Sequence, residues 1–368
     1  MELVCVDKDL GAVRLRDHLG TDLSYPFIWL RDNCPSAYHP DTKERTFDLL
    51  SVEMDREPEA VRTDGDTLIV EWPDHTSQFS MNWLSEHRPG VPVADPADLP
   101  AVPWRGDLGS SNIPRAKAQD VLHDDGALKD WLEATRRYGL SIVEGLEDDP
   151  EAGMAVARRV GFLRETNFGT TFQVKSKPNP NNLAYTADAL PLHTDLPNQE
   201  LPPGFQFLHC LANAAEGGGS IFADGVAISE DLCREDPEAF HLLSTVSIPF
   251  RFHDEAYDIR RRQFVITTRE DGQVSEVCYN AHIAGTFDLP AEQMRGYYRA
   301  YRAFMAKTRD PRYVLSLTLS GGQMVVFDNR RVLHGREAFD PNTGRRHLHG
   351  CYVDRGEFES RLRVLARR

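Results

Sequence analysis

The feature that most constrains the fold is a series of short β-type segments that fills the chain from Gly204 onward. The segments FQFLHC, GSIFA, STVSIPF, QFVITT and MVVFD are rich in β-branched or aromatic residues and are separated by residues typical of turns. Closely spaced short strands with helices beside them are typical of a double-stranded β-helix, or jelly roll. We therefore predict a mainly β domain of this type with flanking helices.

A smaller β-rich module precedes this domain. Residues 13–84 contain short alternating segments (VRL, SYPFIWL, TLIVEW) that are punctuated by Asp-Gly and Pro-Asp turn signals. Residues 88–104 carry five prolines, which favour a stiff connector over a helix or strand. A chain of 368 residues is long enough for two domains. We expect an N-terminal domain at residues 1–90 and the jelly-roll domain at residues 105–368.

Two helices are predicted between the connector and the β-rich region. Residues 127–138 place apolar side chains at helical spacing and are followed by Gly139, a favourable C-terminal cap. Asp149 and Pro150 are typical of the start of a second helix.

The charge of the chain excludes some partners. A formal net charge of -15 repels phosphate backbones and anionic membrane surfaces, so we expect neither nucleic acid nor a membrane as a partner. The sequence contains no apolar run of the roughly 18 residues that a membrane span requires, and its start does not resemble a signal peptide. We expect a cytoplasmic protein whose six scattered cysteines are reduced.

A metal site is indicated by one of three His-x-Asp triplets. The triplets occupy residues 39–41, 123–125 and 193–195, so chance alone produces the pattern. Iron that reacts with oxygen is typically held by two histidines and one carboxylate on one face. The third triplet precedes the Pro-Pro-Gly turn that opens the strand FQFLHC, where both of its side chains could reach one ion. The second triplet instead precedes a predicted helix, where its acidic residues suit the helix N-terminus.

His334 is the predicted third ligand, because a late strand of a jelly roll returns beside an early one. Arg346 follows twelve residues later and suits the distal carboxylate of 2-oxoglutarate, since a guanidinium binds both oxygens in one plane. A single histidine is more often structural than a ligand. The combination of His193, Asp195, His334 and Arg346 is hard to reconcile with a purely structural role.

Over nearly its whole length the chain resembles γ-butyrobetaine hydroxylase and trimethyllysine hydroxylase, members of the TauD-like group of 2-oxoglutarate-dependent enzymes. The matching stretches are WLRDNC at 29–34, EWPDH at 71–75, NNLAYT at 181–186, HTD at 193–195, PPGFQFLHC at 202–210, FDNRRVLHGR at 327–336 and RHLHGCY at 346–352. This resemblance implies a dioxygenase that uses Fe(II), 2-oxoglutarate and O2. It also implies that His193, Asp195 and His334 bind iron, and that Arg346 and Ser220 contact 2-oxoglutarate.

The resemblance further implies an aromatic cage for a trimethylammonium group. The matching positions are Phe168, Phe172, Tyr185 and Tyr352. A quaternary ammonium cannot donate hydrogen bonds, so the faces of aromatic rings recognise it, at roughly 0.5–2 kcal/mol per contact. The alternative is that these rings only fill the core.

Asn182 and Asn280 match positions that hold the substrate's carboxylate in the family. The family's Asn-Asn-x-x-Arg run is changed here, because an expected arginine is missing and His282 has appeared. We therefore expect a small trimethylammonium substrate whose acidic end is a carboxylate (γ-butyrobetaine) or a phosphonate (2-trimethylaminoethylphosphonate), with His282 near that end. A dioxygenase for an unrelated small acid and a non-catalytic quaternary-amine binding protein are the alternatives.

The N-terminal module of the family carries a structural zinc held by three cysteines and one histidine. Here Cys34 and His75 are in place, but the other two positions are Ser36 and His39. Cys34, His39 and His75 could still form a three-ligand zinc site, since imidazole is an ordinary zinc ligand. The alternative is a site that has decayed. We expect the module to support a homodimer or to frame the mouth of the active site.

Other enzyme classes fit the residues less well. A halogenase of this fold needs chloride at the position that Asp195 occupies. A quaternary-amine sensor has no need for both Asp195 and Arg346. A serine or cysteine hydrolase is disfavoured because the sequence has no GxSxG motif or similar nucleophile setting.

Overall fold

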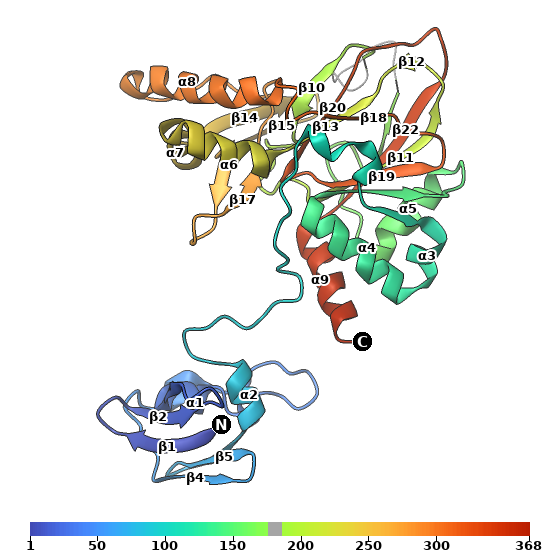
Figure 1. The fold of residues 1–368 in the computed structure, drawn as a ribbon. Helices are drawn as coiled ribbons and strands as arrows, with labels where there is room; N and C mark the ends of the chain where they lie inside the picture. The colour runs from blue at the N-terminus through green and yellow to red at the C-terminus, as the bar shows by residue number, and fades with distance from the viewer. Residues whose placement is uncertain (176–185) are drawn as a thin grey trace. The chain divides into compact units, whose positions relative to one another are not determined.

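The computed structural model describes residues 1–175 and 186–368. The chain divides into two compact units, Met1–Asp95 and Pro96–Arg368, each with its own hydrophobic core (Figure 1). Among the described residues, no helix is both long enough and apolar enough to cross a membrane.

The N-terminal unit contains two three-stranded antiparallel sheets, ordered β1-β2-β3 and β4-β5-β6. Its strands and helices are β1 (Glu2–Asp7), β2 (Ala12–Arg16), β3 (Asp22–Pro26), α1 (Phe27–Asp32), β4 (Ala60–Asp64), β5 (Thr67–Glu71), β6 (Thr76–Ser80) and α2 (Met81–Glu86). Alternation directs one face of a strand inward: in β6, Ser77 and Phe79 are buried and their neighbours are exposed. The core formed in this way encloses Leu68, Trp72 and Cys34.

The larger unit is mainly β with flanking helices. Its strands are β7 (Arg115–Lys117), β8 (Leu140–Glu144), β9 (Thr171–Val174), β10 (Leu190–His193), β11 (Phe205–Asn213), β12 (Glu216–Gly217), β13 (Ser220–Asp224), β14 (Ile248–His253), β15 (Asp258–Gln263), β16 (Ile266–Thr268), β17 (Val274–Val277), β18 (Leu315–Leu317), β19 (Gln323–Asp328), β20 (Val332–Arg336), β21 (Phe339–Asp340) and β22 (Arg346–Val353). Its helices are α3 (Ala118–His123), α4 (Asp125–Tyr138), α5 (Pro150–Val160), α6 (Gly225–Glu235), α7 (Pro237–Thr245), α8 (Ala291–Thr308) and α9 (Arg355–Ala366).

Two sheets pack face to face in this unit and form the double-stranded β-helix. The six-stranded sheet has the order β7-β8-β19-β11-β22-β9, and the four-stranded sheet has the order β10-β20-β13-β18. The period of two along β19 explains the layers, because Val325 and Phe327 face the small sheet while Met324 and Val326 face the helices. Phe327 meets Phe222 of β13 across the interface, with ring centroids 5.5 Å apart.

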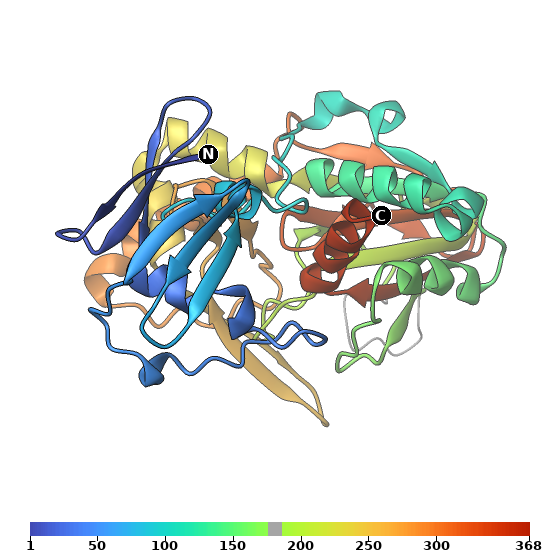
Figure 2. The same cartoon turned by 90° about the horizontal axis from the view of Figure 1, so that it is seen from below.

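Helices cover the outer face of the six-stranded sheet. α3, α4, α5 and α9 bury their apolar side chains on it, and α4 and α9 lie side by side (Figure 2). The ends of these helices follow from local chemistry: Asp124 caps α4 by accepting from the Ala127 amide (2.6 Å), and Gly139 ends it with a φ of 69°. Asp149 caps α5 in the same way, accepting from the Glu151 amide (3.0 Å). Helices α6, α7 and α8 share a separate core with the hairpins β14-β15 and β16-β17.

Candidate active site

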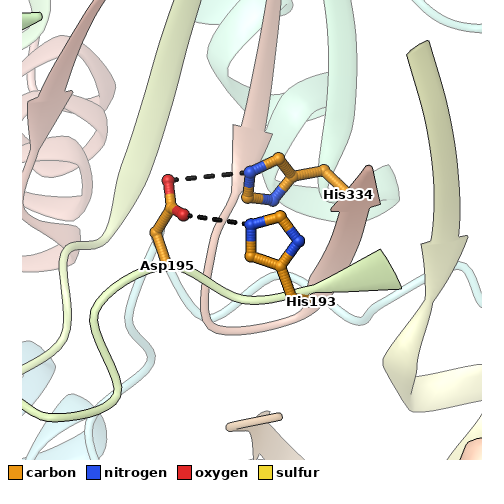
Figure 3. Close-up of side chains that lie close together, drawn as sticks. All are labelled: His193, Asp195 and His334. Atoms are coloured by element: carbon orange, nitrogen blue, oxygen red, sulfur yellow. Dashed lines mark ion pairs between the residues drawn. The ribbon is translucent and has the colours of Figure 1, made fainter. Parts of the chain in front are cut away.

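Two histidines and one aspartate meet where β10 pairs with β20. His193 and His334 are direct partners in this antiparallel pair, so their side chains project from the same face. His193 Nε2 lies 3.3 Å from Asp195 Oδ1, and His334 Nε2 lies 3.6 Å from Asp195 Oδ2 (Figure 3). One ligand atom from each residue lies within 4.8 Å of the other two. This set of two imidazoles and one carboxylate has the donor types of a facial iron site.

Hydrogen bonds from neighbouring residues orient these side chains. His193 Nδ1 lies 2.9 Å from the Pro191 carbonyl oxygen, so a proton on Nδ1 leaves Nε2 free as a ligand. The Asn329 side chain fixes the loop after β10, accepting from the Asp195 amide (2.6 Å) and donating to the Asp195 carbonyl (3.0 Å). The Tyr352 hydroxyl donates to Asp195 Oδ2 (2.7 Å). These four hydrogen bonds hold His193 and Asp195 in place beside His334.

The protonation states of the group also suit metal binding. Burial alone would raise the pKa of the Asp195 carboxyl, but His334, His193 and the Tyr352 hydroxyl together hold this pKa below its usual range. Burial lowers the pKa of His334 to about 3, which outweighs the opposite effect of Asp195. At neutral pH the group therefore consists of a carboxylate and a neutral His334 imidazole, the forms that bind metal ions.

Arg346 lies at the start of β22, and its guanidinium is only partly hydrogen-bonded. The residue is buried, its Nε donates to the Gly218 carbonyl (3.3 Å), and its Nη1 has no hydrogen-bond partner among the described residues. A Cβ atom at Gly218 would lie 2.9 Å from Nε, so glycine at this position makes room for the guanidinium. Burial lowers the pKa of Arg346 to about 10, with Arg336 adding to the effect. A buried, partly unpaired cation is costly, and this arrangement is therefore suited to an anion.

The described aromatic residues predicted for the cage form two ring pairs. Phe172 packs against Tyr352 with centroids 5.0 Å apart, and Phe168 packs against Phe252 at 5.3 Å. Phe252 was not among the predicted residues. Phe172 also lies over Gly350, its partner across the β9–β22 pairing, where a side chain would collide with the ring.

Asn280 and His282 reach the site from the loop after β17. The Asn280 side chain donates to the Thr194 carbonyl (3.2 Å) and accepts from the His282 amide (3.0 Å), so it ties this loop to the residue between His193 and Asp195. The His282 ring lies 6.2 Å from the His193 ring, and burial lowers the pKa of His282. These contacts give Asn280 a positioning role that the sequence did not predict.

All predicted site residues of the larger unit that the structure describes line one cavity of about 390 Å³. They are Phe168, Phe172, His193, Asp195, Ser220, Asn280, His282, His334, Arg346 and Tyr352. Asn182 and Tyr185 fall outside the described residues. The cavity is large enough for 2-oxoglutarate and a small second molecule.

Other polar residues of the cavity were missed by the sequence analysis. Asn198, Gln206, Arg251 and His253 line it. Asn198 lies three residues after Asp195 in the polar run LPNQE, a signal that could have been noticed. The others lie on β11 and β14 within ordinary strand patterns, so only the folded structure reveals which way they face.

The predicted zinc residues of the N-terminal unit come together only in part. Cys34 Sγ lies 3.3 Å from His75 Nε2, and Ser36 Oγ lies 3.1 Å from both atoms. His39 turns away, and its Nδ1 accepts from the backbone amides of Asp41 and Thr42. Among the described residues, only the His193, Asp195 and His334 group brings three His, Cys, Asp or Glu ligand atoms together. The ligand atoms of Cys34, His39 and His75 therefore do not converge in the described structure, because the local turn holds His39.

Comparison with known proteins agrees with this geometry. Residues 102–352 match the family model of the taurine catabolism dioxygenase TauD, TfdA family, and residues 5–85 match the γ-butyrobetaine hydroxylase-like N-terminal domain. The γ-butyrobetaine dioxygenase of Pseudomonas sp. (strain AK-1) is 42% identical over 92% of this chain and 90% of its own length. The human γ-butyrobetaine dioxygenase is 31% identical, over 94% of this chain and 92% of its own. The trimethyllysine dioxygenase of Gallus gallus is 30% identical, over 95% and 86%.

A solved structure shares the fold of the larger unit. An asparagine oxygenase superposes with a TM-score of 0.50 at 17% identity, covering 64% of this chain and 82% of that protein. The sequence matches extend much further, because they span both units. The chain therefore belongs to the TauD, TfdA family of dioxygenases, in the branch with a γ-butyrobetaine hydroxylase-like N-terminal domain, and it uses Fe(II), 2-oxoglutarate and O2.

Proposed function

We propose that this dioxygenase hydroxylates a C–H bond of a small trimethylammonium compound with an acidic end. The two candidates are γ-butyrobetaine and 2-trimethylaminoethylphosphonate. The observation that carries the proposal is one cavity that combines the His-Asp-His group, the partly unpaired guanidinium of Arg346 and paired aromatic rings. The names of the relatives, which include γ-butyrobetaine and trimethyllysine dioxygenases, support a quaternary-ammonium substrate.

In this proposal His193, Asp195 and His334 hold Fe(II), which when bound activates O2 with 2-oxoglutarate as the source of two electrons. Asp195 would contribute a negative charge to the bound ion, and His193 and His334 would each contribute one imidazole nitrogen. The Tyr352 hydroxyl and the His193 contact to Pro191 keep these ligands oriented. Which carbon of the substrate is oxidised then depends on where the cavity holds the substrate.

Arg346 anchors the distal carboxylate of 2-oxoglutarate, with Ser220 as a second contact. The free Nη1 of Arg346 and its burial support this role, since an anion would satisfy both the charge and the missing hydrogen bond. Ser220 lies on β13 directly opposite Arg336 of β20 and lines the same cavity. Arg336 itself is committed to the carbonyls of Thr186 (2.9 Å) and Asp188 (2.6 Å).

The trimethylammonium group is proposed to bind against Phe172, Tyr352 and Phe168, with Tyr185 as a further member of the cage. The ring faces attract a cation without requiring a hydrogen bond. The Tyr352 hydroxyl is engaged with Asp195, so this ring also links the cage to the iron site. A carbon a few bonds from the ammonium would consequently be held near the metal, and the protein selects that carbon by placement.

The acidic end is proposed to lie toward His282, with Asn182 and Asn280 beside it. Arg251 and His253 on β14 line the same cavity, where the Arg251 guanidinium donates to both carboxylate oxygens of Asp258 (2.7 and 3.0 Å). β14 is joined to that loop, because the Arg251 amide donates to the Ile283 carbonyl (2.9 Å).

The direct test is succinate release by the iron-loaded protein with each candidate compound. The proposal predicts substrate-dependent succinate release with γ-butyrobetaine, the phosphonate or both. Release of succinate that neither compound stimulates above the substrate-free rate would refute it. Comparing the two compounds identifies the acidic group, and trimethylammonium alcohols of equal length serve as controls without an acidic group.

Homodimerisation through the N-terminal unit stays a prediction from the family resemblance. Light scattering of the full chain would check it, with a mass of twice 41.6 kDa expected.

A further inference from the structure

Asn198 is a buried polar residue whose side chain makes no hydrogen bond within the described structure. Its exposed fraction is 0%, and neither Nδ2 nor Oδ1 has a partner among the described residues. Buried amides are almost always paired, because an unpaired one gives up its bonds to water without replacement. A molecule bound in the cavity would supply the partner that the described residues do not provide.

A second buried asparagine shows what a structural amide looks like in this fold. Asn329 is also 0% exposed, but its side chain makes three hydrogen bonds, to the Asp195 amide, the Asp195 carbonyl and the Pro203 carbonyl. Groups of the chain itself therefore satisfy the side chain of Asn329. Asn198 lines the active-site cavity, and nothing in the described chain uses its amide.

The backbone around Asn198 is held firmly in place. Leu196 has a φ of 57°, and among the described residues only it and Lys43 combine a side chain with a left-handed φ. This conformation is unfavourable for leucine and persists only where the surroundings impose it. Gln199, the residue after Asn198, accepts hydrogen bonds from Gln263 at its carbonyl (3.1 Å) and from Arg164 at its side chain (3.0 Å). Asn198 is consequently presented to the cavity by a strained but anchored turn.

The chemistry of the proposed substrate limits what Asn198 can bind. A trimethylammonium group has neither a hydrogen-bond donor on nitrogen nor an acceptor, so it cannot satisfy an amide. The oxygens of the acidic end can accept from Nδ2. Asn280, the described residue predicted to hold that end, already uses one N–H of its side chain on the Thr194 carbonyl and its Oδ1 on the His282 amide.

We propose that Asn198 is a substrate-binding residue that donates from Nδ2 to an oxygen of the substrate's acidic group. This inference rests on the proposed function and adds a specificity determinant to it. Oδ1 is then left to accept from a water or from a protonated acid oxygen. A phosphonate that retains one proton can satisfy both atoms of the amide, whereas a carboxylate can satisfy only Nδ2. Asn198 should therefore contribute more to binding of the phosphonate.

The test compares Asn198→Leu and Asn198→Asp with the wild-type enzyme, using γ-butyrobetaine and 2-trimethylaminoethylphosphonate in separate succinate-release assays. Asn198→Leu removes the donor at similar volume and should raise KM for the turned-over compound about tenfold, as expected for one hydrogen bond to a charged group. Asn198→Asp replaces the donor with a negative charge and should raise it further. KM for 2-oxoglutarate should stay unchanged in both variants. If both compounds are turned over, the rise should be larger for the phosphonate.

Thermal unfolding of the metal-free protein supplies a matched control. Asn198→Leu should leave Tm unchanged or raise it, because it removes an unpaired buried amide, whereas Asn329→Leu should lower Tm by breaking three hydrogen bonds. Asn342→Leu, in an exposed turn, should change neither KM nor Tm.

The outcomes separate this inference from the proposed function. If the wild-type enzyme turns over a candidate compound but Asn198→Leu has an unchanged KM, the inference is overturned and the proposed function stands. A rise in KM for 2-oxoglutarate instead, or a fall in Tm as large as that of Asn329→Leu, also overturns it. If the wild-type enzyme turns over neither compound, the proposed function fails and the inference fails with it.

Discussion

The two units each contain a cluster of polar, metal-type side chains, and the clusters differ in how many ligand atoms converge. In the larger unit His193, Asp195 and His334 bring three ligand atoms within 4.8 Å of one another. In the N-terminal unit Cys34 and His75 meet with Ser36, a poor ligand, between them. The first cluster has the donors of an iron site, and the second has two good donors where a closed structural zinc site needs four.

The difference follows from the backbone that carries each cluster. His193 and His334 are opposite each other on paired strands, so the sheet itself fixes their separation. Cys34 and Ser36 lie at a short turn, and the turn that follows directs His39 Nδ1 toward the backbone amides of Asp41 and Thr42, which donate to it. The separation of ligands on paired strands is therefore set by the sheet, whereas the separation of ligands on turns depends on the path of each turn.

Removing a ligand from the larger unit should have the largest effect. His193→Ala or Asp195→Ala should lower turnover by more than about 1000-fold, which corresponds to about 4 kcal/mol of transition-state stabilisation, because the iron site is lost. Succinate release measures the loss, and circular dichroism should show an intact fold. His75→Ala is the counterpart in the N-terminal unit and should keep its turnover. Full activity in His193→Ala would contradict the assignment, as would equal losses in both variants.

The next largest effect is expected at Arg346. Arg346→Ala should raise the 2-oxoglutarate concentration required for half-maximal turnover by roughly 10–100-fold. This range corresponds to the loss of about 1.5–3 kcal/mol, which is typical of hydrogen bonds to a charged group. KM for the trimethylammonium substrate should change little. Steady-state kinetics with each substrate varied in turn separates the two effects. An increase confined to the second substrate would assign Arg346 to the wrong molecule.

A smaller effect is expected for the hydrogen bond between Tyr352 and Asp195. Tyr352→Phe keeps the ring of the cage but removes the hydroxyl that donates to Oδ2. Losing such a contact to a metal ligand typically weakens metal affinity by about 10-fold or more. Anaerobic Fe(II) titration should therefore show weaker binding. Unchanged iron affinity together with a raised substrate KM would indicate that the hydroxyl serves the cage alone.

The smallest effect is expected at Cys34. Purified protein loaded only with iron should contain no stoichiometric zinc by elemental analysis. Cys34→Ala should cost about 1–2 kcal/mol of unfolding free energy, as for a small cavity in a core, and leave turnover intact. A different result would contradict this comparison: one zinc per chain in the wild-type protein, with both zinc and turnover lost in Cys34→Ala. The N-terminal cluster would then be a metal site that the enzyme needs, as the iron site is.

Much of the larger unit could be predicted from the sequence. The jelly-roll fold, the family, the dioxygenase activity and the dependence on Fe(II) and 2-oxoglutarate are confirmed. These features depend on period-two strand patterns and on motifs such as His193-Thr194-Asp195, which are local in sequence. The predicted end of α4 and the predicted start of α5 also agree with the structure. Gly139 ends α4 and Asp149 caps α5, and both effects depend on the local backbone.

The features that the sequence did not reveal depend on long-range packing. Asn198 follows the predicted ligand Asp195 by three residues in the run LPNQE, but the lack of a hydrogen-bond partner for its side chain is visible only in the folded chain. Phe252 and Arg251 reach the cavity because β14 pairs with β15 and contacts the loop after β17, a topology that local patterns do not specify. The separation of His39 from Cys34 likewise depends on the path of one turn.

The most direct test of the account is Fe(II) binding by the wild-type chain and by His334→Ala under anaerobic conditions. If the three side chains hold one ion, titration calorimetry should give one Fe(II) per wild-type chain and an affinity at least about 100-fold lower for His334→Ala. Equal affinity and stoichiometry in the two proteins would contradict the account, because the ion would then be bound without the strand that brings His334 to His193 and Asp195.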